Sequence, residues 1–362
     1  AIYTVFLLTF IDNGYKIYFK SIYRQEKKMK LNGSDIIAEV LIEQGVDTIF
    51  GYPGGAVLNI YDALYKYRDK IHHILTAHEQ GASHAADGYA RATGKTGVVI
   101  ATSGPGATNL VTGIATAYMD SIPMVAITGN VGTSYIGKDA FQEVYITGIT
   151  MPITKHNFFV SDIKELAPTL REAFKIANSG RKGPVLVDIP KDVTAAITEY
   201  EKAAPEVIID NTVINEDEVK KAAALINKAK RPVIEIGGGV VSSEASDLVR
   251  MLVNKTGAPC CHTLMAAGVL GYSEKLNYGL VGMHGSFVTN KAIDEADVLV
   301  AIGTRFSDRV ALNTNRFAHK AKVIQIDIDL SEIDKNVKVD HALVGDVKTI
   351  VMDLLHYVKQ SD

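Results

Sequence analysis

Short runs of uninterrupted apolar residues, each followed by a helical pattern, constrain the fold of this 362-residue chain more than any other feature. GVVIAT (97–102) and PMVAITGNV (123–131) lack the alternation of polar and apolar residues that a half-exposed strand shows. Strands of this kind are buried on both faces, which is typical of a parallel sheet covered by helices on both sides. The sequence therefore predicts an α/β fold of doubly wound parallel sheets.

Two series of such strands predict two domains. The first domain covers residues 29–193 and begins with a helix that has Ser34 as its cap and Gly45 as its stop. A linker at 194–215 precedes a second, Rossmann-like domain at 216–362 with six parallel strands. The strands are predicted at 47–55, 71–77, 97–102, 123–131 and 183–190, and then at 231–239, 258–264, 278–285, 297–306, 322–329 and 341–346.

The first 28 residues read differently from the rest. The apolar run 1–11 is cut short by Asp12 and Asn13, and it falls below the roughly 18–20 apolar residues that span a bilayer. The regular pattern starts at Met29, so we expect residues 1–28 to lie outside the domain. A membrane anchor is the alternative for this segment.

Composition narrows the class of partner. A net charge of −3 gives no reason to expect nucleic acid or an anionic membrane as a partner. The two cysteines, Cys260 and Cys261, are adjacent, so in a strand they point to opposite faces and form neither a disulfide nor a metal site. A cytoplasmic protein with no metal site in this chain is expected.

The stretch TAHEQGASHAADGYARATG (76–94) places Glu79 directly after an apolar strand, at the start of a helix rich in small residues. Small side chains allow another surface to approach the backbone closely. Two readings stay open on these residues alone. Glu79 is either a solvated carboxylate at the first turn of an interface helix, where the helix dipole favours negative charge, or a catalytic group.

In open parallel sheets, ligands bind beyond the carboxyl ends of the strands. In the second domain Gly237, Gly238 and Gly239 follow one strand there and allow close backbone approach to a pyrophosphate. Asp327 ends another strand, where its carboxylate could accept hydrogen bonds from ribose hydroxyls. Arg305 and Arg309 could neutralise phosphate. The glycines lack the GxGxxG order, so tight turns are the alternative to a dinucleotide site.

The motifs taken together are more specific than any one of them. YPGGAVLNIYDAL, AHEQGASHAADGYARATGKTGVVIATSGPGATNLVTGIATAYMDSIPMVAITGNV, GKDAFQE and GRKGPVLVDIPKDV occur in that order. GGG, TLM, GMHG, TRFSDR, IDID and GD follow in the second domain. Over residues 29–362 the chain resembles the large catalytic subunit of the acetolactate synthase (acetohydroxyacid synthase) family, which uses thiamine diphosphate.

The resemblance implies roles for individual residues in the first domain. Glu79 would be catalytic, hydrogen-bonding the aminopyrimidine ring of thiamine diphosphate and favouring its imino form. Gly55 and Ala56 would line the active site, and Phe141 and Gln142 would reach the substrate channel. Lys191 would attract pyruvate at the entrance; a solvated lysine at a domain edge is the alternative.

The resemblance also implies an FAD site. The residues carried over to it are Arg181, Gly237, Gly238, Gly239, Thr263, Leu264, Met265, Met283, His284, Gly303, Arg305, Asp308, Arg309, Asp327, Gly345 and Asp346. The family's third domain, which holds Mg²⁺ and the cofactor's diphosphate, has no counterpart in these 362 residues, so we expect a fragment that is inactive on its own.

The implied reaction decarboxylates pyruvate and condenses the two-carbon unit with pyruvate or 2-oxobutyrate, in branched-chain amino-acid biosynthesis (isoleucine and valine). Expected partners are a second copy of the chain, as a homodimer or tetramer, and a small regulatory subunit. Rival readings are pyruvate oxidase, oxalyl-CoA decarboxylase, a catabolic FAD-free acetolactate synthase, or a non-catalytic FAD-binding protein. The segments AFQE and TRFSDR favour acetolactate synthase over its enzymatic rivals.

Overall fold

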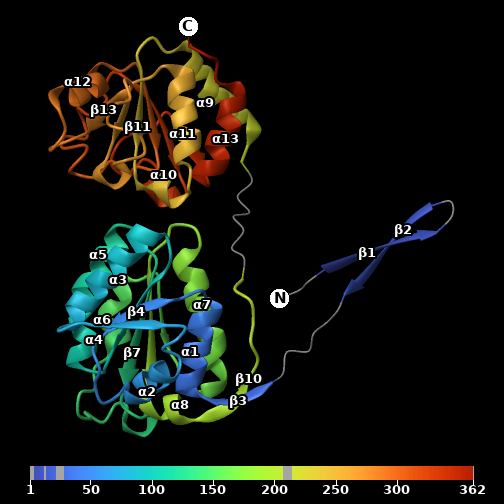
Figure 1. Cartoon of the computed structure of the whole chain (residues 1–362). Coiled ribbons are helices and arrows are strands. Elements are labelled where there is room, and N and C mark those ends of the chain that lie inside the picture. Colours follow the sequence, from blue (N-terminus) through green and yellow to red (C-terminus); the bar gives the residue numbers. More distant parts are fainter. Residues whose placement is uncertain (1–3, 12–13, 22–27, 207–213, 362) are drawn as a thin grey trace. The chain divides into compact units, whose positions relative to one another are not determined.

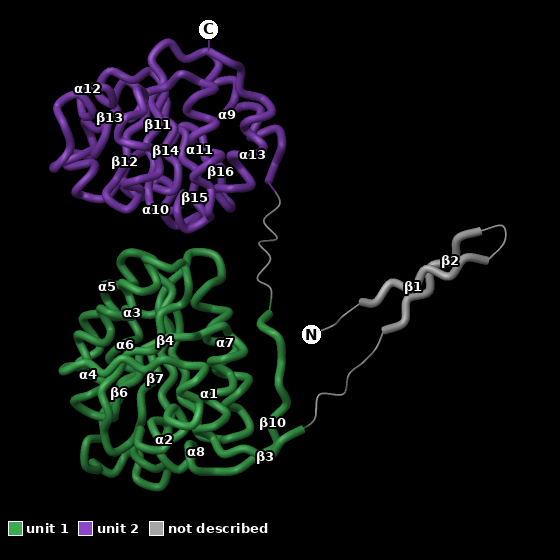
Figure 2. Tube along the Cα trace, viewed as in Figure 1, with its two compact units in different colours: residues 1–208 green, residues 209–362 purple. Residues whose placement is uncertain are grey.

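The computed structural model describes the backbone of residues 4–11 and 14–21 and all atoms of residues 28–206 and 214–361. The chain divides into two compact units, residues 1–208 and residues 209–362 (Figure 2). Each unit is described by itself. Part of the predicted linker, residues 207–213, lies outside the described residues.

Unit 1 is built on a six-stranded parallel sheet with the order β5-β4-β6-β7-β9-β8 (Figure 1). The order departs from the chain order in the way that crossover helices on both faces produce. The strands are β4 (Thr48–Gly51), β5 (His72–Leu75), β6 (Gly97–Ala101), β7 (Met124–Asn130), β8 (His156–Phe159) and β9 (Pro184–Pro190).

Helices cover both faces of this sheet, which confirms the predicted doubly wound architecture. Residues of α1 (Gly33–Glu43), α2 (Leu58–Lys66) and α7 (Ile163–Asn178) join one buried apolar cluster. Residues of α3 (Glu79–Thr93) and α5 (Val111–Met119) join another. Strand residues alternate between the two clusters: Val98 and Ile100 belong to the first, Val99 and Ala101 to the second. The remaining helices of unit 1 are α4 (Pro105–Asn109), α6 (Ile146–Thr150), α8 (Lys191–Ala195), η1 (Thr133–Tyr135) and η2 (Met151–Ile153).

The cap predicted for α1 is wrong by two residues. The side chain of Asn32, not Ser34, accepts the hydrogen bond from the backbone N–H of Asp35, with 2.7 Å between oxygen and nitrogen. Ser34 lies inside the helix, where its hydroxyl donates to the same Asn32 oxygen at 2.9 Å. Gly45 follows the helix with φ +75°, as its predicted role as stop requires.

Two short strand pairs lie outside the main sheets. β3 (Met29–Asn32) pairs antiparallel with β10 (Ile197–Tyr200), so residues assigned to the linker in the sequence continue unit 1. In the N-terminal segment, β1 (Thr4–Ile11) and β2 (Gly14–Ser21) form an antiparallel pair. The expectation that residues 1–28 lie outside the domain stays a prediction.

Unit 2 is built on a second six-stranded parallel sheet, with the order β13-β12-β11-β14-β15-β16. All six strands predicted for this domain are present: β11 (Pro232–Ile236), β12 (Cys260–His262), β13 (Asn277–Leu280), β14 (Val298–Ile302), β15 (Lys322–Asp327) and β16 (His341–Val344). Its helices are α9 (Glu216–Lys228), α10 (Gly238–Ser242), α11 (Ser246–Thr256), α12 (Phe287–Glu295), α13 (Val347–Tyr357), η3 (Leu264–Ala266) and η4 (Leu330–Glu332).

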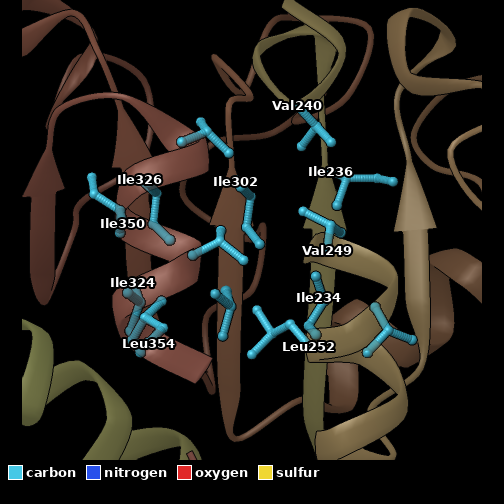
Figure 3. Packing of buried hydrophobic residues seen from close by; sticks show 14 of the residues in the cluster. Ile234, Ile236, Val240, Val249, Leu252, Ile302, Ile324, Ile326, Ile350 and Leu354 are labelled. Carbon is cyan, nitrogen blue, oxygen red and sulfur yellow. The ribbon is translucent and has the colours of Figure 1, made fainter. Parts of the chain in front are cut away.

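One apolar core of unit 2 lies between this sheet and helices α9, α10, α11 and α13. Figure 3 shows Ile234, Ile302 and Ile324 of three neighbouring strands facing Leu252 of α11 and Leu354 of α13. All five are at most 1% exposed. Within the described residues, no helix is both long and apolar enough to cross a membrane.

Candidate functional sites

The carboxyl ends of the unit 1 strands bring three glycine-containing loops together. After β4, the backbone N–H of Ala56 donates to the hydroxyl of Thr102, which follows β6, at 3.2 Å. A Cβ on Gly54 would lie 2.4 Å from Thr102, and one on Gly129 of β7 would lie 2.9 Å from Ala56. No side chain fits at Gly54 or Gly129, so Ala56 is held at this edge of the sheet. Gly55 is exposed beside it.

Glu79 lies at the same edge, as the first residue of α3, and is 8% exposed. The side-chain amide of Asn109 donates to its Oε2 at 3.0 Å. Oε1 has no hydrogen-bond partner among the described residues, and it lies 3.2 Å from where a Cβ of Gly106 would be. Burial and then the charge of Glu79 raise the pKa of Tyr61. A half-satisfied, buried carboxylate at this edge suits a ligand that brings its own donor.

Some small residues of α3 pack against neighbouring elements, and others face solvent. A Cβ on Gly113 of α5 would lie 2.1 Å from the hydroxyl of Ser83, and one on Gly97 of β6 would lie 2.3 Å from the carbonyl of Ala86. These positions are therefore needed for packing within the chain. A Cβ on Gly81 would meet nothing within 4 Å, because Gly81 lies on the exposed side of α3.

The loop after β7 reaches this edge through Gln142. Gln142 has φ +59°, and a Cβ on Gly104 would lie 2.7 Å from its carbonyl oxygen. Its neighbour Phe141 is 86% exposed. Lys191 begins α8 directly after β9 and is exposed. The structure thus gathers Gln142 and Lys191 at the edge that holds Glu79, and it leaves Phe141 in solvent in this single chain.

Sequence reasoning missed Asp188, which lies in β9 and is 2% exposed. Its carboxylate accepts hydrogen bonds from the Thr128 hydroxyl at 2.7 Å and from the Asn130 amide at 2.6 Å. Burial outweighs these two bonds and raises the pKa of Asp188 to about 6. An acidic residue inside the otherwise apolar run PVLVDIP was the signal that could have found it.

Arg181 is the one FAD candidate in unit 1. It lies before β9, at the amino edge of the sheet, and its Nε donates to the hydroxyl of Ser121 at 2.8 Å. Two cavities, of about 230 and 480 Å³, also lie at the amino edge of this sheet and share Gln44, Thr96 and Asn178. Neither is lined by Glu79, and their lining charges already form ion pairs with other side chains, so we do not assign the site there.

In unit 2 the glycines predicted for the pyrophosphate lie against the loops that follow β14 and β12. The N–H of Gly239 donates to the carbonyl of Gly303 at 3.1 Å, and a Cβ on either residue would lie 2.6 Å from the other's Cα. A Cβ on Gly237 would lie 2.2 Å from the Gly303 carbonyl. Gly238 stands against Met265, where a Cβ would lie 3.1 Å from the Met265 side chain. The glycines are therefore needed for the close approach of two loops.

The other FAD candidates follow the neighbouring strands. The N–H of Met283 donates to the carbonyl of Arg309 at 2.9 Å, and the Arg309 guanidinium lies 3.7 Å from the Met283 sulfur. Thr263 continues β12 with a backbone bond to Ile236, and Arg305 is half-buried. The exposed candidates at this edge are Leu264, Met283, His284, Asp308 and Arg309.

Two predicted acidic residues have local partners. Asp327 is 8% exposed and accepts from the N–H of Asp329 at 3.0 Å. Asp346 caps α13 by accepting from the N–H of Thr349 at 3.1 Å. Gly345, which follows β16, is tied to the end of β15, because its N–H donates to the carbonyl of Asp327 at 2.9 Å. All the unit 2 candidates thus lie at one carboxyl edge, and Asp346 has a structural role there.

Glu235, within β11, is a second buried acid that sequence reasoning missed. It is 0% exposed and accepts from the Thr304 hydroxyl at 2.9 Å. Burial raises its pKa to about 7. In the described parts of the chain, no group of three or more His, Cys, Asp or Glu side chains forms a metal site.

Comparisons with known proteins agree with this architecture. Residues 31–149 match the family described as "Thiamine pyrophosphate enzyme, N-terminal TPP binding domain", and residues 219–354 match "Thiamine pyrophosphate enzyme, central domain".

Three relatives named for one activity are similar to most of the chain. The probable acetolactate synthase large subunit of Methanocaldococcus jannaschii is 51% identical over 331 residues, which is 90% of this chain and 56% of that protein. The acetolactate synthase of Mycobacterium bovis is 51% identical over 330 residues, 90% of this chain and 53% of that protein. The acetolactate synthase large subunit of Corynebacterium glutamicum is 47% identical over 336 residues, 92% and 53%.

The chain spans about half the length of the curated relatives it matches. The family resemblance predicted from the motifs is confirmed by the two domain matches and by these identities. The chain belongs to the thiamine pyrophosphate enzymes, carries their N-terminal and central domains, and is similar to acetolactate synthase large subunits.

Proposed function

We propose that this chain is the part of an acetolactate synthase large subunit that holds the pyrimidine end of thiamine diphosphate and an FAD. Glu79 carries the proposal: it is buried at a sheet edge, with one oxygen held by Asn109 and the other without a partner among the described residues. The identities near 50% to proteins named acetolactate synthase support the choice of activity.

Bound thiamine diphosphate would supply a carbon nucleophile for the decarboxylation of a 2-oxo acid. Glu79 would hold a proton at Oε1, facing the pyrimidine ring, while Asn109 fixes the orientation of the carboxylate. Gly106, where a Cβ would lie 3.2 Å from Oε1, keeps side chains away from that oxygen. Lys191, exposed at the same edge, would attract the carboxylates of pyruvate and of a second 2-oxo acid, pyruvate or 2-oxobutyrate.

Unit 2 would bind FAD along the carboxyl edge of its sheet. The close approach of Gly239 and Gly303 leaves backbone without side chains where a pyrophosphate would lie. Arg305 and Arg309 follow the same strand as cations for the phosphates. By the same resemblance we propose domains at 29–193 and 216–362, Mg²⁺ as a further cofactor, a homodimer or tetramer, a small regulatory subunit and a cytoplasmic location.

Calorimetric titration of the purified chain with FAD, and separately with thiamine diphosphate, tests the proposal. Asp327→Ala should weaken FAD binding by about tenfold or more, because a charged hydrogen bond contributes about 1.5–3 kcal/mol. Glu79→Ala should weaken thiamine diphosphate binding by a similar factor. Each variant is the matched control for the other ligand, and each should leave the other affinity unchanged.

Three outcomes would overturn parts of the proposal. A folded wild-type chain that binds no FAD would remove the FAD assignment and favour an FAD-free relative. Thiamine diphosphate binding that Glu79→Ala leaves unaffected would remove the role of Glu79. If either variant weakens both ligands while its melting temperature falls, the effect is on folding rather than on a site.

A further inference from the structure

Two fully buried oxygens without partners lie on strands that flank β14 in unit 2. They are Oε2 of Glu235 in β11 and Oε1 of Gln325 in β15, and both residues are 0% exposed. In the sheet register, Glu235 and Gln325 both pair with Ala301 of the intervening strand. Their Cα atoms are therefore two strand spacings, roughly 10 Å, apart on one face, with only a methyl group between their side chains.

Thr304 joins the two residues. Its hydroxyl donates to Oε1 of Glu235 at 2.9 Å, and its carbonyl accepts from Nε2 of Gln325 at 3.2 Å. The second contact fixes the amide orientation of Gln325, because Nε2 must face carbonyl oxygens. Oε1 of Gln325 is thus an acceptor that needs a donor, and a buried acceptor left unsatisfied costs about 1–3 kcal/mol.

We propose that Glu235 is a positioning residue for the loop 303–309: as a neutral acid, it accepts from Thr304 and donates its proton to Oε1 of Gln325. This single proton would satisfy both orphaned oxygens. It would also fix Thr304 between β11 and β15, directly after Gly303 and before Arg305. The hydrogen bonds themselves follow from the contacts in unit 2, whereas the link to ligand binding rests on the proposed FAD site.

The surroundings of Glu235 favour the neutral acid. Its register partner on β12 is Cys261. Burial raises the pKa of the Cys261 thiol well above its usual range, so this neighbour carries no charge. Burial likewise raises the pKa of Cys260, which precedes it, to about 12. Beside Gln325 on η4, Glu332 already has Lys335 as an ion-pair partner at 2.9 Å. The cation named here, Lys335, pairs with Glu332 and not with Glu235, and burial favours the neutral form of Glu235.

Amide hydrogen exchange of the full chain from pH 5 to pH 8 tests the proposal, with Glu235→Gln as the variant. Its neutral amide can accept from Thr304 and donate to Gln325, so it reproduces the proposed acid without a titrating proton. In the wild type, Glu235 is neutral at pH 5 and ionises by pH 8, because burial raises its pKa to about 7. Ionisation removes the proton shared with Gln325, so protection of the Gly303 and Gly239 amides should fall roughly 50- to 100-fold over this range.

Glu235→Gln should keep the protection measured at pH 5 and lose the fall. Glu295→Gln, which removes a half-exposed carboxylate of the same unit, is the control and should retain the wild-type profile. FAD affinity should follow protection in all three chains.

Two results would overturn the inference. If Glu235→Gln keeps the wild-type pH profile, Glu235 is not the titrating group. If it is already less protected at pH 5, the wild-type residue is not acting as a neutral acid. Failure of the wild type to bind FAD would instead count against the proposed function, because the amide readout does not require FAD.

Discussion

The ion pair between Glu43 and Arg171 gives the sharpest prediction about the stability of unit 1. The Glu43 side chain is 0% exposed, and Arg171 donates to both of its oxygens, at 2.9 and 3.0 Å. The hydroxyl of Tyr200 and the N–H of Ala203, at 2.9 Å, also donate to Glu43. One buried carboxylate therefore joins α1, α7 and the segment that follows β10.

Arg171→Met should lower the free energy of unfolding of unit 1 by about 3–5 kcal/mol, because it leaves a buried carboxylate without its counter-charge. Glu43→Gln should cost less, about 1–3 kcal/mol, since Arg171 is 26% exposed and can be hydrated. The double variant Glu43→Gln/Arg171→Met should be more stable than Arg171→Met alone. Its neutral amide can still accept from Tyr200 and Ala203 without an unpaired charge.

Hydrogen exchange followed by mass spectrometry measures each variant at pH 7. A loss of about 3 kcal/mol would speed opening-limited exchange of α1 peptides by roughly 100-fold. Peptides of α11 and α13 report on unit 2 and should not change. If the double variant is as unstable as Arg171→Met, the damage comes from lost packing of the arginine stem, and the electrostatic reasoning is refuted.

Two further predictions concern buried or crowded positions. Burial raises the pKa of Asp188 to about 6, above its unfolded value, so the wild type should lose stability as pH rises from about 4 to 6, by about 3 kcal/mol in total. Asp188→Asn should remove this fall in urea-unfolding midpoints measured from pH 4 to pH 7; an unchanged slope would contradict it. Gly282→Ala should cost well over 2 kcal/mol, because at φ +87° its Cβ would lie 2.1 Å from the Arg309 carbonyl. Gly268→Ala, at φ +93° with nothing within 4 Å, should cost only the backbone strain of about 1–2 kcal/mol, and equal losses in urea unfolding would argue against the steric contact.

The apolar strands and the loops at their carboxyl ends could be predicted from the sequence because both signals are local. GVVIA and VLVAI are buried on both faces, and short β-branched runs of this kind between turn residues favour a central parallel strand. β8 was not predicted. Its sequence, HNFF, follows an irregular stretch, lies at a sheet edge and is not fully apolar. β10 was assigned to a linker because its partner β3 lies far away in the chain, and no local pattern reports such a pairing.

The residues of the candidate sites were predicted through family motifs, but the hydrogen bonds and pKa shifts at these sites could not be predicted. That Glu79 follows a strand and begins a helix is visible in the sequence, but its bond to Asn109 depends on how α3 and α4 meet. Glu235 and Asp188 each interrupt an apolar run, so the signal was present. Its meaning depends on neighbouring strands: Thr304 and Gln325 in one case, Thr128 and Asn130 in the other.

The pairing of β3 with β10 determines how unit 1 can be inserted into another chain or circularly permuted. Met29 pairs with Tyr200 and Asn32 with Ile197, so the start of β3 and the end of β10 are neighbours, about 5 Å apart. A unit with adjacent ends can be inserted into a loop of another protein, because the two host residues at the insertion point need to move apart by only one strand spacing. It also tolerates circular permutation, with residues 29 and 206 joined by a short peptide so that Ala203 is kept, and new ends opened in an exposed loop.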